Sequence, residues 1–149
     1  MGQNGTGKST LIKICTEQII PDSGRVIWQP NITIGYLDQY AEIDHTLTMK
    51  EFLKSAFAKL FEIEIQVMQL YEKAADGDMK NLELAAYYQE QLETHDFYSI
   101  DTAIERVANG LGLLAIGLDR PIIEMSGGQR AKVILAKLLL EKPDVLLLD

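Results

Sequence analysis

Near its N-terminus the chain reads Gly2-Gln3-Asn4-Gly5-Thr6-Gly7-Lys8-Ser9, followed by Thr10 and a run with helical spacing. This stretch fits the pattern Gly-x-x-x-x-Gly-Lys-Ser/Thr at every fixed position. Glycines in such a loop let successive backbone amides turn toward a phosphate without Cβ clashes, and the following helix N-terminus adds partial positive charge. In this pattern Lys8 reaches β- and γ-phosphate oxygens, the Ser9 hydroxyl coordinates Mg²⁺, and Thr10 adds a hydroxyl near the α-phosphate. The stretch therefore predicts a P-loop for a nucleoside triphosphate.

The other end of the chain, Val145-Leu146-Leu147-Leu148-Asp149, is an apolar run that ends in an acid. Such a run is typical of a parallel strand covered on both faces. A P-loop normally follows a strand, and only Met1 precedes Gly2. We therefore expect residues 1–149 to be an internal piece of a larger α/β protein, truncated at both ends.

Composition limits the class of protein. The chain has 14 Lys+Arg against 22 Asp+Glu, a net charge of −8, and is 47% hydrophobic, as expected for a soluble globular domain. No apolar run reaches the ~18 residues of a membrane-spanning helix, and no basic-then-apolar leader opens the chain. The single Cys15 excludes an internal disulfide and favours a reducing, cytoplasmic setting. The acidic balance argues against broad, sequence-independent nucleic-acid binding.

Periodicity and turn residues predict the elements that follow the P-loop. The helix that begins at Lys8 should end before Pro21, because proline cannot continue it. Two short strands are expected, Arg25–Trp28 and Ile32–Leu37, and Asp38-Gln39 follows the second directly.

A long helical pattern occupies the middle of the chain. Apolar residues recur at three- and four-residue steps from about Thr48 to Ala75, and a second stripe runs from about Met79 to Thr94. The break between them predicts an antiparallel helical hairpin. Residues 50–96 hold five Lys and ten Asp/Glu, a net charge of −5 that is typical of a solvated helix face.

Two further helices are predicted before the final strand. Ser99 is expected to cap a helix that ends at Gly110. Ser126-Gly127-Gly128-Gln129 opens a helix that runs to Leu140 and is stopped by Pro143. Backbone amides at the start of this second helix would form another anion site.

The run Met125-Ser126-Gly127-Gly128-Gln129 resembles the LSGGQ signature of ABC-type ATPases, with Met125 in place of the usual leucine. Together with the P-loop, this resemblance covers essentially the whole chain and implies an α/β P-loop NTPase fold that binds ATP and Mg²⁺. By the same resemblance, Ser126, Gly127, Gly128 and Gln129 cap the γ-phosphate of a nucleotide held on an opposing nucleotide-binding domain.

The resemblance also assigns roles to two residues that follow the strands. Gln39 falls where the family has its Q-loop glutamine, and Asp149 falls at the end of the Walker B strand. The resemblance implies catalytic roles for Lys8, Gln39 and Asp149, with Ser9, Gln39 and Asp149 around the metal. The family's catalytic glutamate would follow Asp149 directly, so we expect the 149 residues alone to have negligible ATP turnover.

The spacing of the motifs resembles one subfamily in particular. Gln39 and Ser126 are 87 positions apart, more than a typical transporter subunit needs, and the surplus is the hairpin. This resembles the first domain of an ABC-F protein, a class with two nucleotide-binding domains in one chain, no transmembrane segments, and members that act on the ribosome. The resemblance divides this partial domain, 1–149, into an arm-like insertion at 48–98 and a signature region at 99–142.

Three functions stay open. The first is a cytoplasmic ABC-F ATPase whose partners are a second nucleotide-binding domain and the ribosome or tRNA, although the acidic hairpin gives no support from charge. The second is the ATP-hydrolysing subunit of a membrane transporter, which would meet a membrane-spanning subunit near Gln39. The third is a catalytically inactive nucleotide-binding module.

Overall fold

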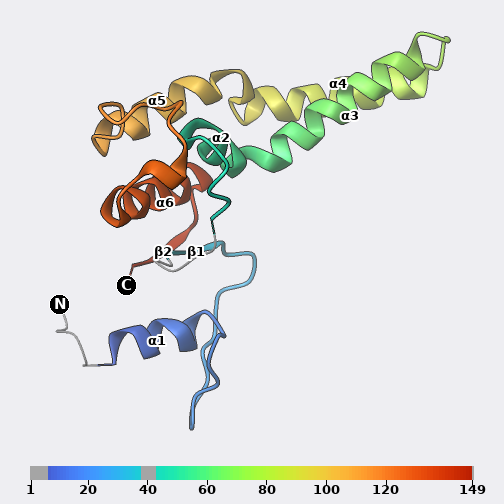
Figure 1. Cartoon of the computed structure of the whole chain (residues 1–149). Helices are drawn as coiled ribbons and strands as arrows, with labels where there is room; N and C mark the ends of the chain where they lie inside the picture. The colour runs from blue at the N-terminus through green and yellow to red at the C-terminus, as the bar shows by residue number, and fades with distance from the viewer. Residues whose placement is uncertain (1–6, 38–42, 149) are drawn as a thin grey trace.

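The computed structural model describes residues 7–37 and 43–148 and shows a mixed α/β chain. Its elements are, in order, α1 (Lys8–Cys15), β1 (Ile34–Leu37), α2 (Met49–Lys54), the 3₁₀ turn η1 (Ser55–Phe57), α3 (Ala58–Ala74), α4 (Met79–Thr94), η2 (Phe97–Ser99), α5 (Ile100–Gly110), η3 (Ile122–Glu124), α6 (Gly127–Glu141) and β2 (Val145–Leu148). In Figure 1 the two strands lie between α1 and the group formed by α2, α5 and α6, and α3 and α4 extend away from that group.

The sheet joins segments that are far apart in sequence. β1 pairs with β2 in parallel, with Ile34 opposite Val145 and Leu37 opposite Leu148. β2 therefore forms where the apolar run predicts a strand, but its side chains are only half-buried and Leu148 is 53% exposed. In the described residues α6 packs against β1, and α1 contributes no buried residue. Coverage of both strand faces is expected of the complete α/β domain, and these 149 residues do not test it.

The segment after α1 differs from the sequence expectation. α1 does end before Pro21 as predicted, at Cys15, and Glu17 then adopts a positive φ of 61°. The strand expected at Arg25–Trp28 is absent: these residues have no regular structure, and the Trp28 indole donates to the Cys15 carbonyl oxygen at 3.1 Å. The prediction of this strand is wrong, because among the described residues no neighbouring strand pairs with this segment.

The core lies where α2, α5 and α6 meet, below the base of α3 and α4. Its largest fully buried side chains are Met49, Leu53, Leu92, Ile104, Leu113, Ile122 and Val133. Burying an apolar side chain of this size contributes about 1.5–3 kcal/mol relative to leaving it in water. Because α6 adds Ala136 and Leu140 to this cluster as well, its N-terminus is held at a fixed position relative to α2 and α5.

α3 and α4 lie side by side and form a helical hairpin through residues 75–78 (Figure 1). α4 has the predicted range, and its N-cap Asp78 accepts a hydrogen bond from the Lys80 amide at 3.0 Å. The single helix expected from Thr48 to Ala75 is instead divided into α2, η1 and α3. The apolar stripe continues through η1, so the sequence pattern did not predict the change from α-helix to 3₁₀ turn.

The start of α5 is also different from the expectation. Ser99 makes no side-chain capping hydrogen bond, because it is the last residue of η2 and its backbone is not extended as an N-cap requires. The helix nevertheless ends at Gly110 as predicted, and Gly112 follows with a φ of +72°.

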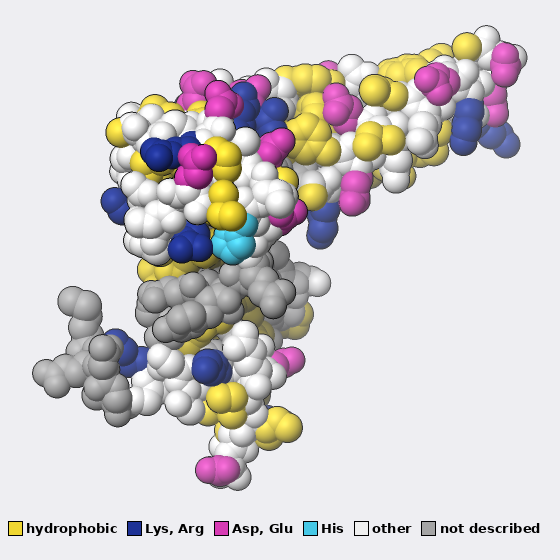
Figure 2. Space-filling view, viewed as in Figure 1, with side chains coloured by type: hydrophobic (Ala, Val, Ile, Leu, Met, Phe, Trp, Pro, Cys, Tyr) yellow, Lys and Arg dark blue, Asp and Glu magenta, His cyan; other side chains and the backbone are white. Residues whose placement is uncertain are grey.

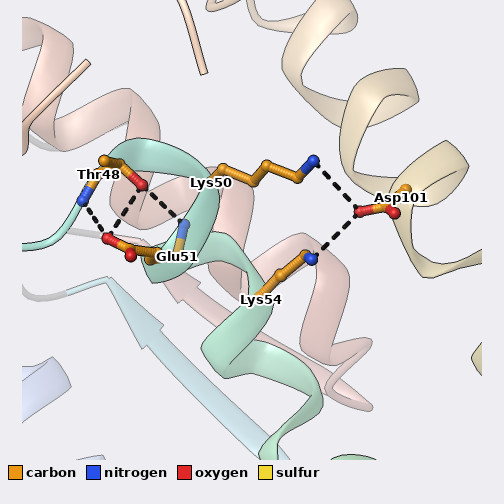
Figure 3. A network of polar contacts seen from close by, with 5 residues as sticks. All are labelled: Thr48, Lys50, Glu51, Lys54 and Asp101. Carbon is orange, nitrogen blue, oxygen red and sulfur yellow. Dashed lines mark hydrogen bonds and ion pairs between the residues drawn. The ribbon is translucent and has the colours of Figure 1, made fainter. Parts of the chain in front are cut away.

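Polar contacts tie α2 to α5 at the base of the hairpin (Figure 3). Thr48 and Glu51 form a capping box at the start of α2: the Thr48 amide donates to Glu51 Oε2 at 2.8 Å, and the Glu51 amide donates to Thr48 Oγ1 at 3.2 Å. From the same helix, the Nζ atoms of Lys50 and Lys54 lie 3.7 and 3.6 Å from Asp101 Oδ1 on α5.

We expect the ion pairs of Asp101 to add little stability, because its side chain is 65% exposed and surface pairs are screened by water and salt. Asp101→Asn should lower the free energy of unfolding by under about 1 kcal/mol, and the difference should vanish at high salt. Denaturant titration at low and high ionic strength measures this, with Asp76→Asn in the exposed turn between α3 and α4 as control. A loss that persists at high salt would contradict the prediction.

Candidate nucleotide-binding site

The described part of the P-loop is the start of α1. Gly7 precedes the helix with φ 87° and ψ 10°, a left-handed conformation that favours glycine, and its carbonyl accepts from the Leu11 amide at 2.9 Å. Lys8, Ser9 and Thr10 form the first turn and are exposed. An α-helix leaves the amides of its first turn without intrahelical acceptors, and these amides favour an anion. Gly7 and this turn thus fit a phosphate group.

The signature run forms the N-terminus of α6. Ser126 is the N-cap, with an extended backbone, and it forms a capping box with Gln129. The Gln129 amide donates to Ser126 Oγ at 3.2 Å, and the Ser126 amide donates to Gln129 Oε1 at 3.0 Å. The prediction that Ser126 to Gln129 open a helix is thus confirmed, and the part of Gln129 in the capping box was not predicted, although the pattern Ser-x-x-Gln is itself a capping-box signal.

The capping box leaves specific donors available to an anion. Ser126, Gly127 and Gly128 are exposed, and a Cβ placed on either glycine would meet nothing within 4 Å. The Gly127 and Gly128 amides belong to the first helical turn, and the Ser126 hydroxyl still has its own proton to donate. Met125, just before the cap, is only 4% exposed and anchors this end of α6 in the core. The arrangement can hold an oxyanion in front of α6.

The other predicted site residues lie outside the described part of the chain. They are Gly2, Gln3, Asn4, Gly5, Thr6, Gln39 and Asp149. Within residues 7–37 and 43–148 no cluster of three or more His, Cys, Asp or Glu could hold a metal ion. β1 and β2 end in step, with Leu37 opposite Leu148. In open α/β sheets ligands bind beyond the carboxyl ends of parallel strands, which is the edge toward which Leu37 and Leu148 lead.

Asp144 is bonded to the opposite strand just before β2 begins, a contact that sequence analysis missed. Its Oδ2 accepts from the Thr33 amide at 2.7 Å and from the Thr33 hydroxyl at 2.8 Å. These two hydrogen bonds, the amide bond first, lower the pKa of Asp144 below the ordinary aspartate value of 3.8. No sequence signal pointed to this pair, since the two residues are 111 positions apart.

The hydrogen bonds of Asp144 predict an acid-side titration. Because the pKa is lowered in the folded state, the two bonds stabilise the fold at pH values above 3.8, and their contribution is lost as pH falls through the folded pKa. Carbon-13 NMR of labelled aspartate carboxyls in the full-length protein should show Asp144 titrating below 3.8. Thr33→Val removes the hydroxyl donor and keeps the amide, so its Asp144 midpoint should rise part of the way back. An unchanged midpoint in that variant would contradict the assignment.

Comparison with known proteins identifies the family. The model of the family described as "ABC transporter" matches residues 1–149, so the chain belongs to the ABC ATPase family. Its curated relatives include proteins of the ABC-F type. The chain is 46% identical to the uncharacterized ABC transporter ATP-binding protein YfmM of Bacillus subtilis and 36% identical to the energy-dependent translational throttle protein EttA of Escherichia coli. It is 34% identical to ABC transporter F family member 2 of Arabidopsis thaliana.

These matches cover 100% of the chain but only 30%, 27% and 23% of the three relatives. The chain therefore spans less than a third of the length of these curated relatives. Among solved structures, a metal-chelate type ABC transporter in an inward-facing conformation matches with a TM-score of 0.54 at 18% identity, over 100% of the chain and 47% of that structure. At this identity the match concerns the fold alone. No helix in the described residues is long and apolar enough to span a membrane.

Proposed function

We propose that this chain is part of a nucleotide-binding domain of an ABC-F ATPase that binds ATP with Mg²⁺, hydrolyses the ATP and acts in translation on the ribosome. The observation that carries the nucleotide part is the left-handed Gly7 leading directly into α1, with Lys8 and Ser9 on the first helical turn. Family membership and the names of the relatives support the rest.

The triphosphate would be held by the P-loop, from Gly2 to Thr10. In this proposal the backbone amides surround the phosphates, the Lys8 ammonium neutralises charge on the β- and γ-phosphates, and the Ser9 hydroxyl binds the metal. Gln39 and Asp149 complete the metal and water surroundings. Mg²⁺ supplies charge neutralisation at the phosphate oxygens, and the protein supplies position and the exclusion of competing geometries.

The N-terminus of α6 would serve a second nucleotide. The Ser126 hydroxyl and the Gly127 and Gly128 amides are exposed donors at a helix N-terminus, where the helix dipole favours an anion. We propose that they contact the γ-phosphate of ATP bound to a second nucleotide-binding domain in the same protein. Two such domains would close on ATP and separate after hydrolysis.

The α3–α4 hairpin, part of the proposed insertion at residues 48–98, would be the contact with the translation machinery in the cytoplasm. In Figure 2 acidic side chains alternate with apolar ones along this hairpin. The large exposed apolar side chains of the hairpin are Ile65, Met68, Tyr71, Met79, Leu82, Leu84 and Tyr87. The proposal that the hairpin contacts the ribosome is supported by the relative named as a translational throttle. The net charge of −5 over residues 50–96 does not support it.

Sedimentation of the full-length protein with ribosomes tests this proposal. The protein should co-sediment with 70S or 80S ribosomes in a non-hydrolysable ATP analogue and should be released in ADP, because closure on two triphosphates is the binding state. A variant that cannot close, Ser126→Asp, should stay in the supernatant under both conditions. Equal sedimentation in analogue and ADP, or recovery in the membrane fraction, would contradict the ribosomal function and favour the transporter alternative.

A further inference from the structure

A small cavity opens at the base of the α3–α4 hairpin, with a lining drawn from α2, α3, η2 and α5. Its volume is about 180 Å³, and a cavity of roughly 150 Å³ is known to hold one benzene ring. It is lined by Lys54, Phe61, Phe97, Tyr98, Ile100 and Asp101. The Phe97 ring meets the other two rings edge to face, with its centroid 5.2 Å from Phe61 and 5.3 Å from Tyr98. The cavity therefore fits one apolar side chain, and a ring above all.

An apolar stripe on α3 leads away from this cavity. Phe61, Ile65 and Met68 follow one another at steps of four and three residues, so they share one face of the helix. Ile65 is 53% and Met68 is 54% exposed, whereas Val67 between them is buried. Over these residues the stripe extends about 10 Å along the helix axis. An exposed apolar stripe that ends in a cavity is typical of a surface that receives an anchor side chain from a partner.

The charges beside the stripe are acidic. Three glutamates stand three or four residues from a member of the stripe and are thus its neighbours on the helix surface: Glu62, Glu64 and Glu72. Neither lysine of α3, Lys59 or Lys73, has such a spacing. Within the described chain none of the three glutamates forms an ion pair. The negative charge along the stripe therefore complements a partner that carries Lys or Arg.

The charges at the cavity itself are already paired. The Nζ atoms of Lys54 and Lys50 lie 3.6 and 3.7 Å from Asp101 Oδ1 (Figure 3). Two cations share one carboxylate there, so this end of the surface attracts no further cation. A partner would place an apolar side chain in the cavity and its basic side chains farther along α3, toward Glu72.

We propose that the cavity and the α3 stripe together form a docking surface for a basic amphipathic segment of another protein. The segment inserts one aromatic or large aliphatic side chain into the cavity and lays Lys or Arg beside the three glutamates. RNA is the poorer partner, because its phosphates would meet these carboxylates. The inference rests on the proposed function, which places the hairpin at the ribosome, and it makes that contact one with protein.

The cavity is tested with Tyr98→Ala in the full-length protein. The variant should bind purified ribosomes about tenfold more weakly in a non-hydrolysable ATP analogue, the size of loss expected when an anchor pocket is opened. Tyr87→Ala is the matched control. Tyr87 is an exposed tyrosine on α4 that meets Tyr88 edge to face at 5.5 Å, much as Tyr98 meets Phe97. Equal affinities for Tyr98→Ala and wild type, or equal losses in the two variants, would overturn the anchor role.

The chemistry of the partner is tested with Ile65→Lys. A cation in the stripe should repel a basic segment and weaken ribosome binding, whereas it would strengthen binding to RNA. Leu84→Lys makes the same change at an exposed residue of α4 near the tip of the hairpin, away from the cavity, and should leave the affinity unchanged. Stronger binding of Ile65→Lys, or an effect equal to that of Leu84→Lys, would contradict a basic protein partner.

Photocrosslinking identifies what lies on the stripe. Benzoylphenylalanine in place of Met68 should crosslink to a protein of the purified ribosome, at a peptide that contains Lys or Arg beside an apolar residue. Crosslinks to RNA alone would overturn the inference while leaving the proposed function intact. If the wild-type protein does not bind ribosomes in the ATP analogue, the proposed function fails and this inference with it.

Discussion

Lys8→Ala in the full-length protein is expected to lower kcat/KM for ATP hydrolysis by about 100-fold or more, the usual effect of removing one preorganised donor from a charged transition state. The residue follows Gly7 on the first turn of α1, where its ammonium group can reach the β- and γ-phosphates that the proposed P-loop holds. ATP affinity should fall as well, because the same charge is paired with bound ATP.

Lys13→Ala provides the matched control for this result. Lys13 is an exposed lysine in the last turn of the same helix, so its loss changes the net charge by the same amount without touching the phosphate end. Steady-state phosphate release and equilibrium nucleotide binding measure both variants. Comparable losses for Lys8→Ala and Lys13→Ala would mean that the glycine-rich motif is a turn without a phosphate role.

Local signals predicted those elements whose cause lies within a few residues. The helix after Ser126 and the helix Met79–Thr94 start and end close to the predicted residues, because caps, glycines and prolines act on neighbouring backbone. The helix that begins at Lys8 starts as predicted and ends at Cys15. The family resemblance could also be found from the sequence, because each of its two motifs is a short run of neighbouring residues. From the sequence, the site could be predicted as a set of residue types at numbered positions, without its geometry. Two of these residues, Gln39 and Asp149, fall outside the described residues.

The errors arise where a distant partner decides the structure. Arg25–Trp28 is a short, mostly apolar run between turn residues, as in a strand. A strand forms only with a neighbour to pair with, however, and the Trp28 indole is bonded to α1 instead. The pairing of Thr33 with Asp144 is set by an approach of segments 111 residues apart, which no pattern along the chain records. Gly35 is similar: a Cβ at this position would lie 2.7 Å from Cγ of Pro143, a residue that precedes β2.

Ser126 gives the second large prediction, because it combines a structural role with a proposed functional one. Its hydroxyl caps α6 and, in the proposed function, also donates to a γ-phosphate. Aspartate caps a helix as well as serine does, and its charge suits the helix N-terminus, so Ser126→Asp should leave the thermal midpoint unchanged. Alanine cannot cap, so Ser126→Ala should lose about 1 kcal/mol of stability.

The two variants separate the roles by the order of their activities. If an anion binds in front of α6, the added carboxylate repels it, and Ser126→Asp should lower ATP hydrolysis by about 100-fold, since like charges held together cost several kcal/mol. Ser126→Ala should then keep more activity than Ser126→Asp although it is the less stable protein. If Ser126 acts only as a cap, the order is reversed, with Ser126→Asp close to wild type and Ser126→Ala reduced. Melting curves and phosphate release on the same full-length preparations decide between these two orders. If an anion binds in front of α6, Ser126→Asp is the more stable but less active of the two variants; if Ser126 is only a cap, it is both the more stable and the more active.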